Sequence, residues 1–395
     1  MTSPPNLRHH YRTCNLCEAM CGLEIALDGD QIVSIKGDKQ DPFSQGHICP
    51  KATALQDVYE DPDRLKHPVR RTAVGWEKIG WAEAFDEVAQ RLHAVQQKHG
   101  RDAVAVYLGN PNSHNAGSIL YAPTLIRALR TKHRYSATSV DQLPHHFASY
   151  FMFGHQLLLP VPDIDRTQFM LILGANPLAS NGSIMTAPGV KKRLQAIQKR
   201  HGRVVVVDPR RTATAELADQ HFFIKPGRDV FLLLGLLHTL FADDLIQHGR
   251  WTNFSRGLED LRQLVSAFTL EKVAPLTGIP AADIRQLAHD FATAESAVCY
   301  GRIGTSVQAF GGLCNWLINL LNILTDNLDE PGGAMFTRPA FDVVGISGAM
   351  GSRGSHNRWQ SRVRQRPEFG GELPVATLAE EMLTPGEGQI RALVT

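Results

Sequence analysis

Cys14-Asn15-Leu16-Cys17-Glu18-Ala19-Met20-Cys21 places three thiols on one short stretch, and a fourth follows in Ile48-Cys49-Pro50-Lys51. The spacing is C-x2-C-x3-C, with 27 residues between the third and fourth Cys. All-thiolate ligation suits iron–sulfur clusters and zinc. A zinc ribbon usually presents two matched pairs, whereas here a tight triplet meets one distant Cys-Pro, which favours a cubane cluster. A zinc module, or scattered core and disulfide cysteines, are the alternatives.

Composition limits what the chain can be. At 395 residues, 43% hydrophobic and 20% charged, it is long enough for two or three globular domains. A net charge of +2 with interspersed signs indicates no nucleic-acid partner. We find no apolar run of about 18 residues and no signal core or twin-arginine start, so we expect no membrane span and a cytoplasmic location, where thiols stay reduced.

The residues around the cysteines form a small β unit. Residues 22–37 alternate, turn at Asp28-Gly29-Asp30 and alternate again, which predicts a hairpin between the Cys triplet and Cys49. We therefore predict a domain over residues 1–66 that depends on its cluster. Further on, Trp81 opens an amphipathic helix that stops at His99-Gly100.

A strand–loop–helix rhythm fills the rest of the chain. Short β-branched runs alternate with helices and predict a doubly wound α/β sheet; the strands fall at 103–108, 169–173, 204–207, 222–224 and 297–300, and the helices at 121–129, 190–201 and 230–241. Residues 331–376, rich in Gly, Pro, Ser and Arg, are interpreted as a long loop or an inter-domain crossing. The apolar end at 388–395 predicts either a sheet-edge strand or a chain that is part of something longer, and we favour the second.

Polar loops follow four of the strands, at 174–183, 208–214, 225–229 and 301–308. Ligands of such sheets bind at the carboxyl ends of the strands. Asp208 could accept a hydrogen bond from a ribose hydroxyl or a purine amino group. Small residues would let backbone N–H groups approach phosphates, as at Asn176, Ser180, Gly227 and Gly304. No G-x-G-x-x-G is present, so an ordinary NAD site is not supported. Together the loops predict a large nucleotide-bearing ligand, although each alone could be a simple turn.

Three further side-chain groups have two interpretations each. Lys51, two residues past a Cys, could lie between the cluster and a second redox centre, or be a solvated lysine. His145 and His146 could be functional or only polar surface. Cys299 and Cys314 lie in apolar segments and are interpreted as core.

With these motifs in order, the sequence resembles the molybdopterin oxidoreductase family, which includes formate dehydrogenases and periplasmic-type nitrate reductases. The resemblance covers nearly the whole chain and rests on the cysteine opening, the Trp81 helix, Gly174-Ala175-Asn176-Pro177, Val207-Asp208-Pro209-Arg210-Arg211-Thr212, Lys225-Pro226-Gly227-Arg228-Asp229, Leu324-Thr325-Asp326-Asn327-Leu328 and Pro331-Gly332-Gly333.

The resemblance implies two cofactors. A [4Fe-4S] cluster would be held by Cys14, Cys17, Cys21 and Cys49, and a bis-(molybdopterin guanine dinucleotide) would carry Mo or W. Lys51 would lie on the electron path between them. The residues that match the family's dinucleotide loops are Asn176, Ser180, Asp208, Arg210, Gly227, Asp229, Gly304, Thr305 and Gln308, with Asp208 expected to read guanine.

The resemblance also implies an architecture: a small β-rich [4Fe-4S] domain plus doubly wound α/β cofactor-binding domains. We expect the cluster domain at 1–66, a Rossmann-like dinucleotide domain at 141–334, an incomplete second α/β domain at 67–140 with 335–395, and no C-terminal dinucleotide domain.

The expected activity is electron transfer between a small substrate and an acceptor, for which an electron-transfer protein subunit is a candidate. Formate is the favoured substrate. A nitrate-type oxyanion reductase and an inactive cluster-binding fragment are the alternatives.

Two departures from the family matter. The position where relatives place a metal-binding Cys or selenocysteine falls at about Phe147, which cannot ligate, so the metal's protein ligand is open. We offer His146 beside it as a proton-handling group. Family chains also continue past residue 395, so we expect a truncated chain to be poor in cofactor.

Overall fold

The computed structural model describes residues 7–395. The chain divides into two compact units, Met1–Ala137 with Ser355–Thr395, and Thr138–Gly354. Residues 335–354 therefore pack with the second unit. The separate domain over residues 1–66 and the other domain limits given above stay predictions.

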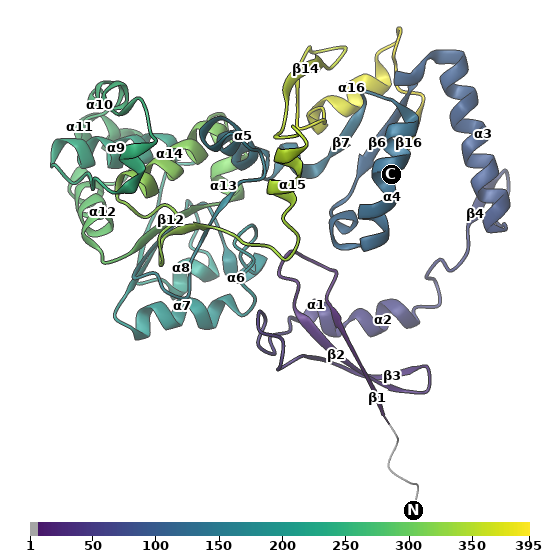
Figure 1. Ribbon diagram of the computed structural model, residues 1–395, viewed down its shortest axis with the longest axis horizontal. Helices are drawn as coiled ribbons and strands as arrows, with labels where there is room; N and C mark the ends of the chain where they lie inside the picture. The colour runs from purple at the N-terminus through teal and green to yellow at the C-terminus, as the bar shows by residue number, and fades with distance from the viewer. Residues whose placement is uncertain (1–6) are drawn as a thin grey trace, which may run out of the picture. The chain divides into compact units, whose positions relative to one another are not determined.

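The first unit begins with the predicted β structure. Strands β1 (Arg8–Thr13), β2 (Gly22–Asp28) and β3 (Gln31–Gly37) pair antiparallel in that order, and Gly29 takes a left-handed φ of 59° in the hairpin turn (Figure 1). Two short helices follow, α1 (Pro50–Thr53) and α2 (Leu55–Glu60). Because Cys14 and Cys21 are buried in the same small apolar cluster as Leu23 and Ile25, the cysteine loop is part of this domain's core.

A second sheet in this unit is parallel, in the order β16 (Ala392–Val394), β6 (Val104–Leu108), β7 (Arg134–Ser136). The apolar end of the sequence thus forms an edge strand, one of the two outcomes expected. The remaining elements of the unit are β4 (Val69–Thr72), β5 (Gly75–Lys78), α3 (Trp81–His99), α4 (Ala116–Leu129), β14 (His356–Gln360), β15 (Pro367–Phe369) and α16 (Leu378–Leu383).

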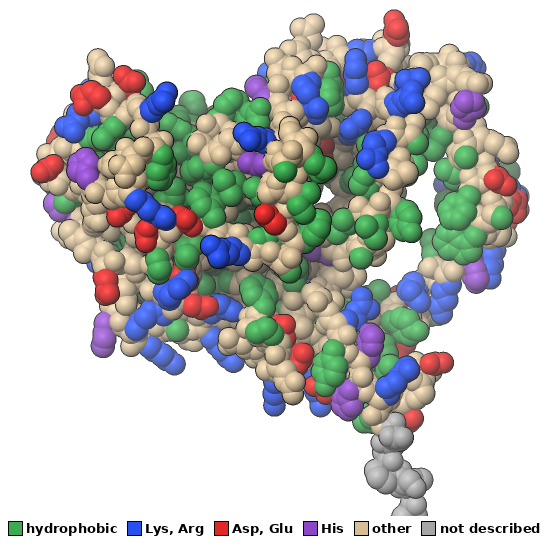
Figure 2. All heavy atoms as spheres, viewed as in Figure 1, with side chains coloured by type: hydrophobic (Ala, Val, Ile, Leu, Met, Phe, Trp, Pro, Cys, Tyr) green, Lys and Arg blue, Asp and Glu red, His purple; other side chains and the backbone are tan. Residues whose placement is uncertain are grey.

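Helix α3 has the predicted limits but only half of the predicted packing. It ends at Gly100, whose φ of 87° favours glycine. Leu92 and Val95 pack against β6, whereas Trp81 and Phe85 are 59% and 66% exposed. Figure 2 shows hydrophobic side chains gathered on the surface where α3 begins.

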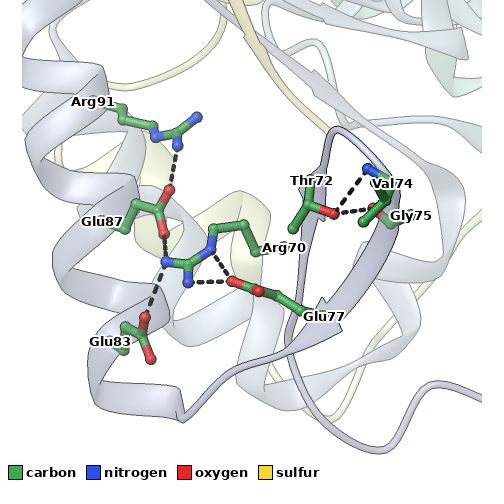
Figure 3. A network of polar contacts seen from close by, with 8 residues as sticks. All are labelled: Arg70, Thr72, Val74, Gly75, Glu77, Glu83, Glu87 and Arg91. Carbon is green, nitrogen blue, oxygen red and sulfur yellow. Dashed lines mark hydrogen bonds and ion pairs between the residues drawn. The ribbon is translucent and has the colours of Figure 1, made fainter.

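The start of α3 is tied to the β4–β5 hairpin by charge. Arg70 Nη1 contacts Glu83 Oε1 at 2.9 Å and Glu87 Oε2 at 3.0 Å, while the same guanidinium binds Glu77 on the paired strand, and Arg91 in turn contacts Glu87 (Figure 3). The network is solvent-exposed, so it fixes the local orientation of the hairpin rather than contributing much stability.

The second unit contains a four-stranded parallel sheet. Its order is β11 (Gln220–Phe222), β10 (Arg203–Val207), β9 (Phe169–Leu173), β12 (Ala297–Gly301). Strands β10 and β11 are added on one side of β9 and β12 on the other, so the topological switch point of the sheet lies between β9 and β12. Alternate residues bury against opposite faces, for example Leu171 on one side and Ile172 on the other. Both faces are covered, which confirms the doubly wound α/β prediction. Strand β11 lies two residues before its predicted position.

Helices cover each face of this sheet. On the face of Leu171 pack α9 (Asp229–Ala242), α10 (Leu258–Ser266), α11 (Leu270–Thr277), α12 (Ala281–Thr293) and α14 (Gly311–Leu324); on the face of Ile172 pack α6 (Pro177–Ser180), α7 (Val190–Lys199) and α8 (Ala213–Leu217). The other elements are α5 (Leu143–Phe153), β8 (Pro160–Pro162), α13 (Ile303–Ser306) and β13 (Ala334–Phe336).

Residues 331–376 are not one long loop, although the chain does pass between the two units within this stretch, at Gly354–Ser355. This stretch contains β13, which pairs with β8, helix α15 (Val343–Ala349), and the β14–β15 pair. These elements are only three to seven residues long, too short for a clear apolar period.

Side chains, and not a further strand, form hydrogen bonds with the outer backbone edge of strand β12. Cys299 N donates to Asn322 Oδ1 at 2.8 Å, and Asn322 Nδ2 donates to Cys299 O at 3.1 Å. Farther along, Ala297 N donates to Asn327 Oδ1 at 2.8 Å. These amides replace the ladder hydrogen bonds that the buried outer edge would otherwise lack.

Replacing Asn322 with Ala should therefore destabilise this unit. Asn322 is only 1% exposed, so its loss leaves both backbone groups of Cys299 buried and unpaired, at an expected cost of about 2–4 kcal/mol in the free energy of unfolding. Urea unfolding measures the change. Asn319→Ala, on the same helix but partly exposed, is the control and should cost under about 1 kcal/mol. Equal effects of the two variants would contradict this account.

Candidate cluster and dinucleotide sites

The cysteine triplet is held by its own backbone. Cys14 N donates to Cys21 O at 2.8 Å and Met20 N donates to Cys17 O at 3.2 Å, with Met20 in a left-handed conformation at φ 46°. These contacts close the loop so that its thiols lie together. Cys14 and Cys21 are buried, while Cys17 and Cys49 are partly exposed.

The electrostatics of the four thiols fit a cationic iron centre. Burial, together with the neighbouring Cys14, Cys17 and Cys49, raises the pKa of Cys21 to about 11. Burial also raises the pKa of Cys14. Such thiols ionise readily only when a metal compensates their charge. Within residues 7–395, no three His, Cys, Asp or Glu side chains converge on a single ion. Four cysteine thiolates are the ligand set of an iron–sulfur cluster.

Lys51 lies directly beside this site. Cys49 caps α1, and Lys51 is exposed in the first turn of that helix. Its ammonium group is therefore available on the surface of the cluster domain.

The carboxyl edge of the second unit's sheet brings the predicted loops together at the switch point. Gly304 N donates to Gly174 O at 2.9 Å, which joins the loops after β12 and β9. A Cβ at Gly174 would lie 2.9 Å from the backbone of Gly304, and Gly174 has a φ of 54°. Glycine is required on both sides of this contact.

Acidic side chains follow β10 and β11. Asp208 Oδ1 accepts from Arg210 N at 2.8 Å, and Asp229, buried at the start of α9, accepts from Gln308 Nε2 at 3.0 Å. Burial and the nearby charge of Asp208 raise the pKa of Asp229. Two carboxylates so close to one another suit a ligand that supplies N–H donors, as guanine does.

Gln308 and Gly227 complete this side of the edge. Gln308 Nε2 also donates to Gly304 O at 2.8 Å, while Gln308 Oε1 is buried and has no hydrogen-bond partner among the described residues. A buried, unpaired acceptor indicates a donor that is absent from the protein itself. Gly227, exposed with a φ of 72°, lies near that oxygen.

The remaining predicted residues differ in what their side chains do. Asn176 Oδ1 accepts from Thr214 Oγ1 at 2.7 Å, and Ser180 is exposed one turn later. Thr305 is fully buried, and its hydroxyl donates to Arg302 O at 2.8 Å, so that hydroxyl serves the local turn.

Helix α5 presents the two histidines. His146 is buried, and its Nδ1 lies 2.8 Å from Gln156 O. A carbonyl only accepts, so Nδ1 carries the proton and Nε2 is left as an acceptor. Burial lowers the pKa of both histidines, that of His145 to about 3, and the charge of Arg302 adds to each shift. Both rings are therefore neutral near pH 7.

Arg302, which the sequence reasoning did not single out, is the buried cation of this edge. Its Nη2 donates to Asp141 Oδ1 at 2.6 Å and to Ser183 Oγ at 2.7 Å. The signal in the sequence was an Arg placed directly after a fully buried strand, in Gly301-Arg302-Ile303-Gly304. Such a position points a charge at the ligand edge of the sheet.

Known proteins match both parts of the chain. The sequence model described as "Molybdopterin oxidoreductase Fe4S4 domain" matches residues 10–60, and that described as "Molybdopterin oxidoreductase" matches residues 64–367. A nitrate reductase of Synechocystis is 28% identical over 89% of this chain and 49% of its own length. Formate dehydrogenase H of Escherichia coli is 27% identical over 80% of this chain and 44% of its own.

A solved structure shares the fold. The acetylene hydratase of Pelobacter acetylenicus superposes with a TM-score of 0.74 at 24% identity, over 87% of this chain and 46% of that one. The present chain thus spans about half the length of the relatives it matches.

A thiol-rich N-terminal domain and a doubly wound sheet whose loops meet at its carboxyl edge are the features of a cluster-containing redox protein. The chain belongs to the molybdopterin oxidoreductase family. Its cofactors are accordingly a [4Fe-4S] cluster and a molybdopterin carrying Mo or W, and the donor sets described above fit both. No helix within residues 7–395 is both long and apolar enough to cross a membrane.

Proposed function

We propose that this chain provides the cluster and the main dinucleotide site of an oxidoreductase that acts on formate. The observation that carries the proposal is the joint match of residues 10–60 and 64–367 to one family, with the family's loops gathered at one sheet edge. When bound, the metal–pterin centre and the cluster supply two-electron redox chemistry. Formate also suits an edge whose buried cation, Arg302, is only partly paired.

We assign the chain's residues to the two cofactors as follows. Cys14, Cys17, Cys21 and Cys49 hold the cluster, and Lys51 lies between it and the pterin. Asp208 and Asp229 receive the guanine N–H groups, since carboxylates are acceptors. The backbone at Gly227 and Gly304 admits phosphate oxygens, and Asn176, Ser180, Arg210, Thr305 and Gln308 line the same loops.

His146 is proposed to take the proton that formate oxidation releases. Oxidation of formate yields carbon dioxide, one proton and two electrons, so a base must stand near the substrate. The hydrogen bond from Nδ1 to Gln156 O fixes the ring and leaves Nε2 free to accept. The lowered pKa keeps that nitrogen unprotonated near neutral pH.

Replacing His146 with Ala should lower kcat for formate by about 100-fold or more while molybdenum and iron contents stay unchanged. Steady-state assays on anaerobically purified protein measure the change. His248→Ala, an exposed histidine stacked on Trp251, is the control and should turn over like the wild type. Wild-type turnover in His146→Ala would end this role.

The electrons need an acceptor outside the chain, and we propose an electron-transfer protein subunit. We place the protein in the cytoplasm because the clustered thiols need a reducing compartment to bind metal. A nitrate-type oxyanion reductase is the second candidate, because the Synechocystis relative is a nitrate reductase. Parallel assays with formate and an electron acceptor, and with nitrate and an electron donor, separate the two.

Metal analysis with a visible spectrum tests the proposal first. About four irons per chain, a brown charge-transfer band and near-stoichiometric Mo or W are expected. Iron without Mo or W would contradict the enzyme and leave a cluster-binding protein. A colourless protein with one zinc would overturn the cluster as well.

A further inference from the structure

Arg302 carries hydrogen-bond donors that the protein leaves unused. The side chain is about 5% exposed, and only its Nη2 is paired, with Asp141 and Ser183. Nε and Nη1 are buried and meet no acceptor anywhere in residues 7–395. One N–H group on Nε and two on Nη1 are therefore available as hydrogen-bond donors.

His145 is the neighbour of this guanidinium. Its Nε2 is likewise buried and unpaired within the described chain, and the charge of Arg302 reaches the ring. A neutral imidazole can donate one N–H without adding charge. Each of the two side chains thus has buried polar atoms without a partner among residues 7–395, and the charge of Arg302 acts on the His145 ring.

The partners of Arg302 balance its charge only in part. Asp141 contacts it through one oxygen, and the Asp141 side chain is 41% exposed, so solvent screens this carboxylate more than the buried cation. Ser183 contributes a neutral hydroxyl. Asp141 lies just before α5, Ser183 in the loop after β9, and Arg302 directly after β12, so the spot lies at the switch point of the sheet.

We propose that Arg302 and His145 form an oxyanion-binding subsite at this switch point. The occupant is an anion with accessible oxygen atoms, either a small carboxylate or nitrate-like substrate or a phosphate group of the dinucleotide. A guanidinium binds such oxygens more specifically than an ammonium because its donors are planar and fixed. The subsite deepens the function proposed above and rests on it for its substrate class.

Oxyanion-dependent thermal stability of the purified protein, without turnover, tests the subsite. Sodium nitrate and sodium formate should raise the melting temperature more than sodium chloride at equal ionic strength. Arg302→Gln should lose this specific rise. Arg285→Gln removes an exposed guanidinium on α12 that pairs with Asp243, and it should keep the rise.

Guanine nucleotide released on denaturation distinguishes the two sources of the anion. If nucleotide content falls in Arg302→Gln and stays full in Arg285→Gln, the occupant is a cofactor phosphate. If nucleotide content is unchanged but the formate or nitrate response is lost, the occupant is substrate. Either result supports the subsite.

Arg302→Lys is a second variant for the case that Arg302→Gln does not fold, because lysine keeps the positive charge and removes the planar donors. It should weaken the oxyanion response or the nucleotide content by about tenfold. Wild-type values of both in Arg302→Lys and Arg302→Gln would overturn the subsite. Absence of molybdenum in the wild type would instead count against the proposed function, and the melting-temperature measurement would still test the anion subsite.

Discussion

Replacing Cys21 with Ser is expected to strip the protein of its iron, from about four atoms per chain to below about one. Burial and three neighbouring thiols raise the pKa of Cys21, so its thiolate, once formed, needs a positive charge nearby, which a bound metal supplies. A serine hydroxyl is a far weaker ligand for iron. Iron quantitation and the visible spectrum report the loss.

The same variant should loosen the N-terminal domain. Its apolar core is small, and Cys14 and Cys21 are themselves part of it, with Leu23 and Ile25. Small domains of this kind fold together with their metal. Limited proteolysis should therefore cut within residues 7–60 first. Cys314→Ser changes a buried cysteine in α14 and should keep its iron. Full iron content in Cys21→Ser would refute the ligand assignment.

Replacing Gly304 with Ala is expected to separate the two loops that build the dinucleotide edge. The added Cβ would lie 2.8 Å from both the Cα and the carbonyl oxygen of Gly174, closer than real Cβ contacts come. Neither backbone can move without breaking the hydrogen bond between Gly304 N and Gly174 O. We expect a loss of about 1–3 kcal/mol in the free energy of unfolding.

The Gly304→Ala variant should also bind less cofactor. The loops after β9 and β12, which we propose to bind the nucleotide, should move apart in the variant, so guanine nucleotide released per chain should drop by about tenfold, equivalent to ~1.4 kcal/mol of binding free energy. Gly348→Ala is the matched control, because a Cβ there meets no atom within 4 Å. Normal nucleotide content and stability in Gly304→Ala would show that the close approach is not needed.

Local patterns predicted most of the secondary structure. The limits of the Trp81 helix follow from its apolar spacing and from Gly100, and the hairpin at residues 22–37 follows from alternation around Gly29. The same patterns could not show that Trp81 and Phe85 would remain exposed, since burial depends on which element packs opposite. They also missed α15, a seven-residue helix with no buried side chain, and the short β14–β15 pair, which is joined by backbone hydrogen bonds.

The sequence by itself determined the doubly wound class and the family and predicted the cluster cysteines, because each rests on residues close together in the chain or on motifs in a fixed order. Only the tertiary structure decided which side chains meet. Arg302 reaches Asp141 across 161 positions, and Asn322 closes the edge at Cys299 across 23. Such contacts depend on strand order, and it is the placement of β12 beside β9 that brings a buried cation to the ligand edge.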